Sequence, residues 1–419
     1  MKGMIKMSKA LFINLFGEGH INPTVGLVKE LINRGEQVTY IAAEEFKQKI
    51  EKTGAKFIGH KNLSILMNDN LNLENSEQPF PPEAIGILKE LKEMIEEITE
   101  TVINSEEKFD YIIYDPFFIL GNEIGRVLKI PTICSISTFA MNEKTNILSS
   151  QSQSQSKESM MQKLQNNSEY IKFVNDLQEK YGIKCPSILN AFLGKGMINI
   201  VYTSKYFQFH SESFDDSYKF IGPSIVDRNE DMSFSLETND KKKVIYISLG
   251  TIFNNSIEFY ESCFKAFDNM DVKVIMSVGE NTDINTFKFI PSNFIVRNHV
   301  SQLEVLKHTD VFITHGGMNS TSEGLYYDVP LILIPQSADQ PAVANRVAEL
   351  GAGIAIRKDK VTPELLKQSV ANILSDNNFK INSGKIGKSL REAGGYKKGV
   401  DEILNLNGLF EKVASGNEK

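Results

Sequence analysis

The segment THGGMNSTSE, residues 314–323, places polar side chains where an apolar run ends and a helix is expected to begin. Two glycines follow His315, and the helix is predicted to start near Met318. Unpaired backbone N–H groups and the positive end of the helix dipole lie at a helix N-terminus, which favours a bound phosphate. Asn319 and Ser320 add side-chain donors there. The segment therefore predicts an anion site.

Glu323 and a later polar pair extend this site towards a sugar. Glu323 follows Asn319 by one helical turn on the same face, where its carboxylate could accept two hydrogen bonds from a ribose diol. The strand that starts at Pro330 leads to Asp339 and Gln340, an acceptor and an amide suited to sugar hydroxyls. Each residue alone fits a turn, a helix cap or a solvated carboxylate. Their joint spacing favours a nucleotide-sugar site.

A second polar cluster, FGEGHINPT at residues 16–24, follows the first apolar run. Gly-x-Gly after a first strand is typical of a dinucleotide-binding turn, and Glu44 after the second strand could act as its ribose-binding acid. However, Asn22 stands where the third glycine is required, and His20 occupies the turn. His20 is open to three interpretations: an ordinary turn residue, part of a dinucleotide site, or a catalytic base.

Asp115 ends the strand YIIY and offers a partner for His20. Adjacent parallel strands end at the same edge of a sheet, so the two side chains are expected within hydrogen-bond reach. A carboxylate on one imidazole nitrogen fixes the tautomer and raises the basicity of the other nitrogen, as a general base for an alcohol or phenol requires. The alternative is that Asp115 caps the following helix.

The elements that must position these residues alternate between strands and helices. A strand over 10–16 precedes a helix with Asn22 as N-cap and Pro23 at its first position, and the alternation continues to the strand PTICSIS. It breaks over 214–240 and restarts with VIYISLGT. This pattern predicts an α/β fold with two doubly wound Rossmann-like domains. The expected parts are an N-terminal domain (1–213), a linker (214–240), a C-terminal domain (241–392) and a final helix (393–419).

Composition limits the class of protein. The chain has 419 residues, which favours two domains, and its net charge of -7 gives no reason to expect a nucleic-acid partner. No apolar run reaches the roughly 20 residues that cross a bilayer, and no signal-peptide cleavage site is evident, so a cytoplasmic location is expected. Cys134, Cys185 and Cys263 fit a reducing compartment. No metal-ligand spacing occurs, so no metal is expected. The Ser/Gln-rich stretch 149–157 is expected to be a mobile loop in the first domain.

At this point the chain resembles the family 1 nucleotide-sugar glycosyltransferases, in their bacterial macrolide and flavonoid branch, over nearly its whole length. HGGMNSTSE, the later Pro330 and the Asp339-Gln340 pair match the family signature, with Asp328 where glycine is usual. The resemblance implies the GT-B fold, with an N-terminal acceptor domain, a C-terminal nucleotide-sugar domain and a last helix that crosses back to the first. It also implies a set of donor-binding residues: His315, Gly317, Asn319 and Ser320 for the diphosphate, Glu323 for the ribose, and Asp339 and Gln340 for the sugar.

The resemblance adds two further donor contacts. His299 and Gln302 stand where plant members have a base-stacking tryptophan and a glutamine, so His299, Val300 and Gln302 are expected near the base. A uridine or a thymidine donor fits an imidazole there. Gly250 and Thr251, after the strand VIYISL, resemble a second phosphate contact. The nucleotide sugar is a co-substrate, and no cofactor is implied.

The same resemblance assigns the chemistry. FGEGHINPT matches the family's catalytic turn, which makes His20 the base and Asp115 its partner. A metal-independent, inverting transfer of a hexose, glucose being favoured, from a UDP-sugar to a flavonoid, phenol or macrolide is implied. The acceptor pocket is expected to include Phe117, Phe118, Phe139 and Met141. Three alternatives stay open: an epimerase of the same architecture, a non-catalytic nucleotide-sugar-binding protein, and an NAD-dependent dehydrogenase.

Overall fold

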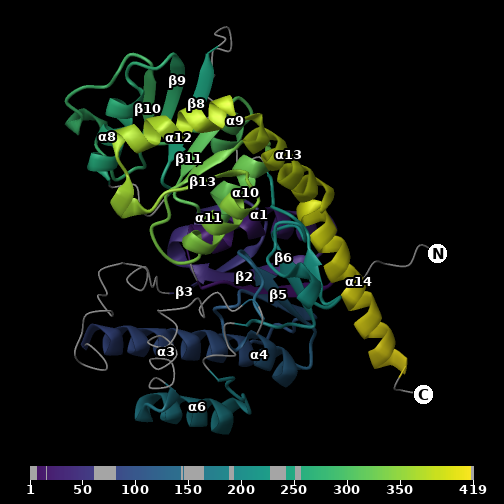
Figure 1. The fold of residues 1–419 in the computed structure, drawn as a ribbon. Helices are drawn as coiled ribbons and strands as arrows, with labels where there is room; N and C mark the ends of the chain where they lie inside the picture. Colours follow the sequence, from purple (N-terminus) through teal and green to yellow (C-terminus); the bar gives the residue numbers. More distant parts are fainter. Residues whose placement is uncertain are drawn as a thin grey trace. The chain divides into compact units, whose positions relative to one another are not determined.

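The chain folds into two compact α/β units, seen in a computed structural model (Figure 1). The structure describes residues 7–15, 17–60, 82–142, 145, 165–187, 193–226, 242–250 and 256–416, with the backbone alone at 82–88 and 407–416. The first unit comprises Met1–Tyr202, Gln208–Ser224 and Gly394–Lys419, and the second comprises Thr203–Phe207 and Ile225–Ala393. Thr251 and the Ser/Gln-rich stretch lie outside the described residues.

The described part of the first unit is built on a seven-stranded parallel sheet in the order β3-β2-β1-β4-β5-β6-β7. The strands are β1 (Lys9–Ile13), β2 (Gln37–Ala43), β3 (Lys56–His60), β4 (Tyr111–Tyr114), β5 (Thr132–Ile136), β6 (Ile198–Val201) and β7 (Tyr218–Phe220). Most of these strands are rich in apolar residues because both faces of the sheet are covered by helices.

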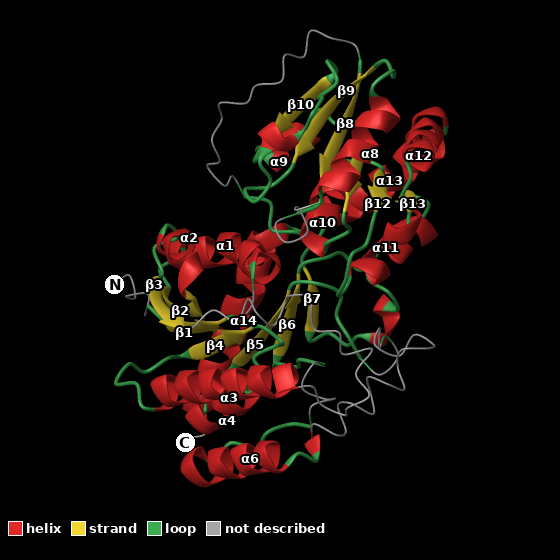
Figure 2. Cartoon of the chain, turned by 90° about the vertical axis from the view of Figure 1, so that its left-hand side faces the viewer, coloured by secondary structure: helices red, strands yellow, loops and turns green. Residues whose placement is uncertain are grey.

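Helices form a layer on each face of this sheet (Figure 2). One layer contains α1 (Glu18–Asn33), α2 (Lys47–Glu51) and α14 (Gly395–Gly416), and the other contains α3 (Pro82–Ile103) and α4 (Gly121–Leu128), with α6 (Ser168–Tyr181) packed on α3. Short 3₁₀ helices lie at Glu44–Phe46 and Ser211–Ser213. The C-terminal helix α14 buries Val400 and Ile403 in the same core as Leu27 of α1, so the end of the chain belongs to the first unit.

The start of α1 differs from the sequence-based expectation. The helix begins at Glu18 with Gly17 as N-cap, four residues before Asn22, so that His20 lies in its first turn. The carbonyl of Gly17 accepts hydrogen bonds from the N–H groups of His20 (2.9 Å) and Ile21 (3.2 Å). Pro23 therefore lies inside the helix. It is the sixth residue of the helix, beyond the first turn, and it lacks the N–H that would donate to the carbonyl of Gly19 one turn earlier.

The described part of the second unit contains a six-stranded parallel sheet in the order β10-β9-β8-β11-β12-β13. Its strands are β8 (Lys243–Ser248), β9 (Val272–Ser277), β10 (Phe294–Arg297), β11 (Val311–Thr314), β12 (Leu331–Leu333) and β13 (Gly353–Ala355). The helices are α8 (Ile257–Phe267), α9 (Gln302–Leu306), α10 (Met318–Tyr326), α11 (Gln340–Glu349), α12 (Pro363–Ser375) and α13 (Asn377–Glu392), with 3₁₀ turns at Ile284–Thr286 and Lys358–Lys360.

The prediction of a linker over 214–240 is wrong for the first part of that range. Residues 218–220 form β7, which pairs in parallel with β6, and the first unit continues to Ser224. The ring of Phe214 contacts those of Tyr218 and Phe220, and all three pack in or on the core of the first unit, which explains why this polar-looking stretch is ordered into a strand. Residues 227–240, the later part of the predicted linker, lie outside the described residues.

Among the helices that the structure describes, none combines the length and the apolar character that a membrane span requires.

Candidate active site and donor site

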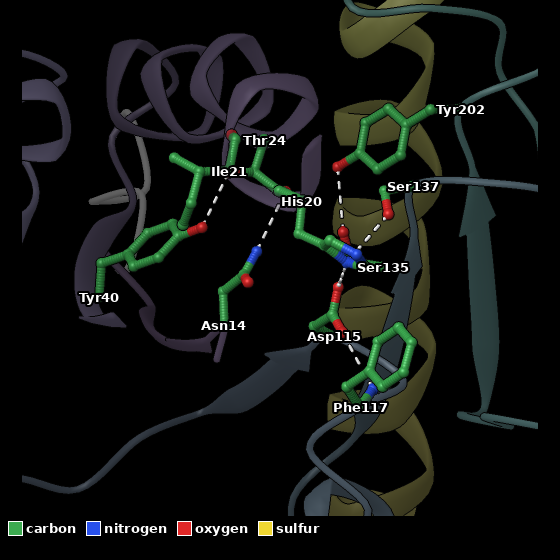
Figure 3. A network of polar contacts seen from close by, with 10 residues as sticks. All are labelled: Asn14, His20, Ile21, Thr24, Tyr40, Asp115, Phe117, Ser135, Ser137 and Tyr202. Atoms are coloured by element: carbon green, nitrogen blue, oxygen red, sulfur yellow. Dashed lines mark hydrogen bonds and ion pairs between the residues drawn. The ribbon is translucent and has the colours of Figure 1, made fainter. Parts of the chain in front are cut away.

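The sheet of the first unit reverses its strand order between β1 and β4, and the candidate catalytic pair lies where these two strands end. In open parallel sheets, such a reversal opens a crevice at the carboxyl ends of the strands, where ligands bind. His20 follows β1 in the first turn of α1, and Asp115 directly follows β4. Imidazole Nδ1 of His20 lies 2.6 Å from Oδ2 of Asp115, as predicted (Figure 3).

Asp115 is held on both carboxylate oxygens. Its side chain is 1% exposed, whereas that of His20 is 16% exposed. Oδ1 accepts a hydrogen bond from the backbone N–H of Phe117 at 2.9 Å, so Oδ2 faces the imidazole. Because an ionised carboxylate only accepts, Nδ1 of His20 carries the proton and Nε2 has the lone pair. This arrangement can remove a proton from a hydroxyl group.

Ser137 is a contact of the imidazole that sequence reasoning missed. Its hydroxyl oxygen lies 3.1 Å from Nδ1 of His20, on the same nitrogen that faces Asp115 (Figure 3). Ser137 follows β5, the neighbour of β4 in the sheet. The only signal was its place at the end of the predicted strand PTICSIS, which by itself does not indicate a contact.

A network of hydrogen bonds from Asn14, Thr24 and Tyr40 holds the backbone of the first turn of α1 (Figure 3). The amide of Asn14 donates to the carbonyl of His20 at 3.0 Å. The Thr24 hydroxyl donates to the Ile21 carbonyl at 2.8 Å, so the Tyr40 hydroxyl, 2.8 Å from the same Thr24 oxygen, must be the donor of that bond. These bonds fix the helix turn that carries the imidazole.

The four predicted acceptor residues differ in how far they are exposed. Phe117 is 36% exposed, and its ring lies edge-on to the imidazole of His20 with 5.2 Å between centroids. Met141 is half-buried. Phe118 and Phe139 are 0% and 1% exposed, so neither ring presents surface to an acceptor in this structure. They follow strand ends as predicted, but their rings are enclosed by the protein.

The second unit repeats the same architecture at its own reversal of strand order, between β8 and β11. Gly250 follows β8 and His315 follows β11, so both lie at the carboxyl edge of the sheet. Burial lowers the pKa of His315 from 6.5 to about 4, so the imidazole is neutral near pH 7. The hydroxyl oxygen of Thr314 lies 3.3 Å from Nδ1 of the same ring.

The predicted anion site lies at the N-terminus of α10. Gly317 is the N-cap, and Met318 begins the helix as expected. Asn319 and Ser320 occupy the first turn with partly exposed side chains. The backbone N–H groups of the first turn and the dipole of α10 are suited to a diphosphate at this point.

Glu323 and Gln302 are brought together beside the anion site. The amide nitrogen of Gln302 donates to Oε2 of Glu323 at 2.7 Å and approaches the hydroxyl of Ser320 at 3.4 Å. Glu323 is 3% exposed. His299 is exposed, as a residue that stacks on a base must be, whereas the Val300 side chain is 4% exposed.

Asp339 and Gln340 begin α11, with Asp339 as N-cap and Gln340 as the first residue. The side-chain amide oxygen of Gln340, Oε1, accepts from the backbone N–H groups of Gln336 (2.8 Å) and Ser337 (3.2 Å). The loop between β12 and α11 includes Ala338 at a φ of 58°. Gln340 thus shapes the loop that carries Asp339, a role that the sequence did not suggest.

Within the described residues, no three or more His, Cys, Asp or Glu side chains gather in a way that could hold a metal ion.

Comparison with known proteins agrees with this architecture. A family model described as "Erythromycin biosynthesis protein CIII-like, C-terminal domain" matches residues 261–392. The chain is 36% identical to the uncharacterized UDP-glucosyltransferase YojK of Bacillus subtilis over 98% of this chain and 100% of that protein. It is 35% identical to the NDP-glycosyltransferase YjiC of the same organism over 93% of this chain and 95% of that protein.

Solved structures show the same fold. The crystal structure of CalG4, the calicheamicin glycosyltransferase, matches with a TM-score of 0.79 and 24% identity, over 96% of this chain and 99% of that chain. Two parallel Rossmann-like sheets are the elements of the GT-B fold. With full-length relatives above 30% identity, the chain belongs to the bacterial branch of the family 1 nucleotide-sugar glycosyltransferases, and it is a glycosyltransferase.

Proposed function

We propose that this enzyme transfers glucose from UDP-glucose to a hydroxyl group of a small molecule, such as a flavonoid, a phenol or a macrolide, with inversion at the anomeric carbon. The observation that carries the proposal is the contact of 2.6 Å between Nδ1 of His20 and Oδ2 of Asp115, at the carboxyl ends of adjacent strands. The name of the relative YojK, a UDP-glucosyltransferase, supports the choice of donor.

The first unit supplies the base. Nε2 of His20 removes the proton of the acceptor hydroxyl, and the carboxylate of Asp115 stabilises the imidazolium that forms. The acceptor oxygen forms a bond to the anomeric carbon as the bond from that carbon to the diphosphate oxygen breaks, and the electron pair leaves with the diphosphate. A single displacement inverts the configuration, so an α-linked donor gives a β-glycoside.

The second unit binds the donor. Backbone N–H groups at the start of α10, with the side chains of Asn319 and Ser320, hold the diphosphate and stabilise its charge as it departs. Glu323 accepts hydrogen bonds from the ribose hydroxyls, His299 stacks on the base, and Asp339 binds the sugar. Thymidine diphosphate glucose is proposed as a second, weaker donor. The imidazole of His299 stacks on a base less strongly than an indole would, so the choice between uracil and thymine is expected to be less strict.

Product analysis tests the proposal. The protein is incubated with UDP-glucose and a panel of flavonoids, macrolides and simple phenols, and products are analysed by mass spectrometry. A mass gain of one hexosyl unit on an acceptor, absent with the His20→Ala variant, is the expected result. Conversion of the donor to an isomeric nucleotide sugar would instead indicate an epimerase. Binding of UDP-glucose with no product from any acceptor would contradict the proposed transfer to these classes.

A further inference from the structure

Three side chains from three elements of the second unit form a line that ends at the proposed ribose carboxylate. The hydroxyl of Tyr246, on β8, lies 3.3 Å from Oε1 of Gln302, the first residue of α9. Nε2 of the same Gln302 side chain lies 2.7 Å from Oε2 of Glu323, on α10. Tyr246 is 1% exposed and Glu323 is 3% exposed, so both ends of the line are shielded from water.

Chemistry fixes the direction of this line. A carboxylate accepts hydrogen bonds and donates none, so the amide nitrogen of Gln302 must face Glu323. The amide oxygen of Gln302 then faces Tyr246, whose hydroxyl can donate to it. The reversed amide would set its oxygen against the carboxylate and lose that bond, although its nitrogen could then donate to the Tyr246 hydroxyl. The carboxylate therefore selects the orientation in which Gln302 donates to Glu323, and the hydroxyl of Tyr246 holds the amide there by donating to its oxygen.

The position of the Tyr246 hydroxyl is set by the sheet. Its ring stacks on Phe312 of the adjacent strand β11, with 4.7 Å between centroids and 17° between ring planes. A stacked, buried ring on a central strand has little freedom to move its hydroxyl. Gln302 lies at the start of a helix of five residues, so an anchor on the sheet restricts a side chain that would otherwise have several rotamers.

We propose that Tyr246 is a positioning residue for recognition of the ribose diol, acting through Gln302 on the carboxylate of Glu323. The inference rests on the proposed function, in which Glu323 binds the ribose. An ionised carboxylate has about four acceptor sites, so a carboxylate that accepts from Gln302 can also accept from a diol. In this role Tyr246 does not touch the nucleotide; its hydroxyl holds the amide of Gln302, which in turn orients the carboxylate of Glu323.

The test compares two nucleotides that differ only in the ribose hydroxyls: UDP and dideoxy-UDP, which lacks the diol. Tyr246→Phe removes the hydroxyl and keeps the stacked ring. We expect the affinity for UDP, measured by isothermal titration calorimetry, to fall by a factor of about 2 to 12, the range for loss of one hydrogen bond. Tyr246→Phe should change the affinity for dideoxy-UDP by less than about twofold, which is less than the loss of one hydrogen bond would cause.

Two further variants make the result specific. Tyr260→Phe is the matched control, because Tyr260 is also buried in the second unit and its hydroxyl bonds to the Val278 carbonyl at 3.4 Å. It should leave the affinity for both nucleotides unchanged. In a Glu323→Ala background, Tyr246→Phe should have no further effect on UDP binding, because the group through which it acts is gone.

The outcomes separate this inference from the proposed function. Equal loss of affinity for UDP and dideoxy-UDP in Tyr246→Phe, or no loss for either, would overturn the positioning role of Tyr246 and leave the ribose role of Glu323 intact. If the parent protein binds the two nucleotides equally well, the ribose role itself is wrong, and the inference fails with it. A preference of the parent for UDP that is reduced in Tyr246→Phe but not in Tyr260→Phe supports both.

Discussion

The imidazole of His315 occupies the space that a side chain on Gly317 would need. A Cβ atom at Gly317 would meet Nε2 of the ring and lie 3.0 Å from Cε1. At Gly250, a Cβ would lie 2.6 Å from Cε1 of the same ring. These glycines therefore make room for the imidazole at the start of α10, in addition to letting an anion approach the backbone.

Gly317→Ala is predicted to displace the His315 ring and weaken donor binding. Gly317 has an ordinary φ of -61°, so alanine adds no backbone strain and the effect comes from the contact alone. We expect the affinity for UDP, measured by calorimetry, to fall about tenfold or more, as for the loss of a hydrogen bond to a charged group.

Gly384→Ala is the control for Gly317→Ala. Gly384 lies in α13 of the same unit, and the nearest atom to a Cβ there is 4.0 Å away. Alanine at this position should leave UDP affinity unchanged and favour the helix slightly. UDP binding by Gly317→Ala at the parent affinity would show that the position of the imidazole does not matter for the donor.

The neutral state of His315 predicts a pH dependence of stability. Burial holds the pKa of His315 at about 4 in the folded chain, against about 6.5 in the unfolded chain. Between these values the unfolded state binds more protons, so this contribution to the free energy of unfolding is present above about pH 6.5 and is lost as the pH falls towards 4. We therefore expect the parent to lose stability relative to His315→Gln between about pH 7.5 and pH 5, by about 1 to 2 kcal/mol. Calorimetric unfolding at both pH values measures this, and a constant difference between the two proteins would contradict it.

Asp328 stands where the related family usually has glycine, and its backbone explains why glycine is usual. It has a φ of 60°, a conformation that costs a residue other than glycine roughly 1 to 2 kcal/mol. Its Oδ1 accepts from Nη1 of Arg391, on α13, at 2.8 Å, but both side chains are more than a third exposed, so the ion pair contributes only about 0 to 1 kcal/mol.

We therefore predict that Asp328→Gly is at least as stable as the parent, and that Asp328→Ala is the least stable of the three proteins. Asp328→Ala keeps the backbone strain and loses the ion pair, whereas Asp328→Gly loses the ion pair and the strain together. Thermal unfolding of the three proteins measures the order. An alanine variant as stable as the glycine variant would show that the backbone at residue 328 relaxes without cost.

Transfer is predicted to proceed without a divalent metal. No Asp-x-Asp sequence occurs in the chain, and the N-terminus of α10 with its backbone N–H groups can meet the charge on the leaving diphosphate. Initial rates with UDP-glucose should be the same before and after treatment with a chelator. Activity that is lost to the chelator and restored by magnesium would contradict this prediction.

The parts of the site that follow from strand order could be predicted from the sequence. His20 and Asp115 end separate apolar runs, and a doubly wound sheet makes those two strands neighbours, so their contact follows from the alternation of elements. The start of α1 could not be placed, because Asn22 and Pro23 match a typical N-cap and first position, whereas the helix begins at Glu18 and contains Pro23 in its interior. β7 was missed because three residues with one lysine give no clear alternation.

Contacts between side chains of elements that are distant in the sequence could not be predicted from the sequence. Tyr246 reads as one more apolar residue of a buried strand, and only the fold shows that its hydroxyl reaches Gln302. Ser137 likewise looks like the polar end of a strand, although it touches His20. Phe118 and Phe139 follow strand ends just as Phe117 does, but burial differs among the three rings, and a linear pattern carries no information on which of them faces solvent.

Substitution of His20 should separate donor binding from chemistry. The imidazole lies in the first unit, whereas the residues proposed to bind phosphate and ribose lie in the second. His20→Ala is therefore expected to bind UDP nearly as the parent does but to lose transfer by a factor of roughly 100 to 10,000, the usual scale of general-base catalysis. Asp115→Asn should lose less, or a similar amount if the amide leaves the wrong tautomer facing the acceptor.

The acidity of the acceptor makes this prediction specific to proton removal. Acidic phenols release their protons readily and need a base least, so they should suffer least in His20→Ala, whereas aliphatic alcohols should suffer most. UDP affinity and turnover are measured together for both variants across phenols of different acidity, with circular dichroism to establish folding. A folded His20→Ala protein that glycosylates aliphatic alcohols at the parent rate would end the general-base assignment. A uniform loss across all acceptors would instead assign His20 to acceptor positioning, since only a base makes the loss depend on how tightly the acceptor holds its proton.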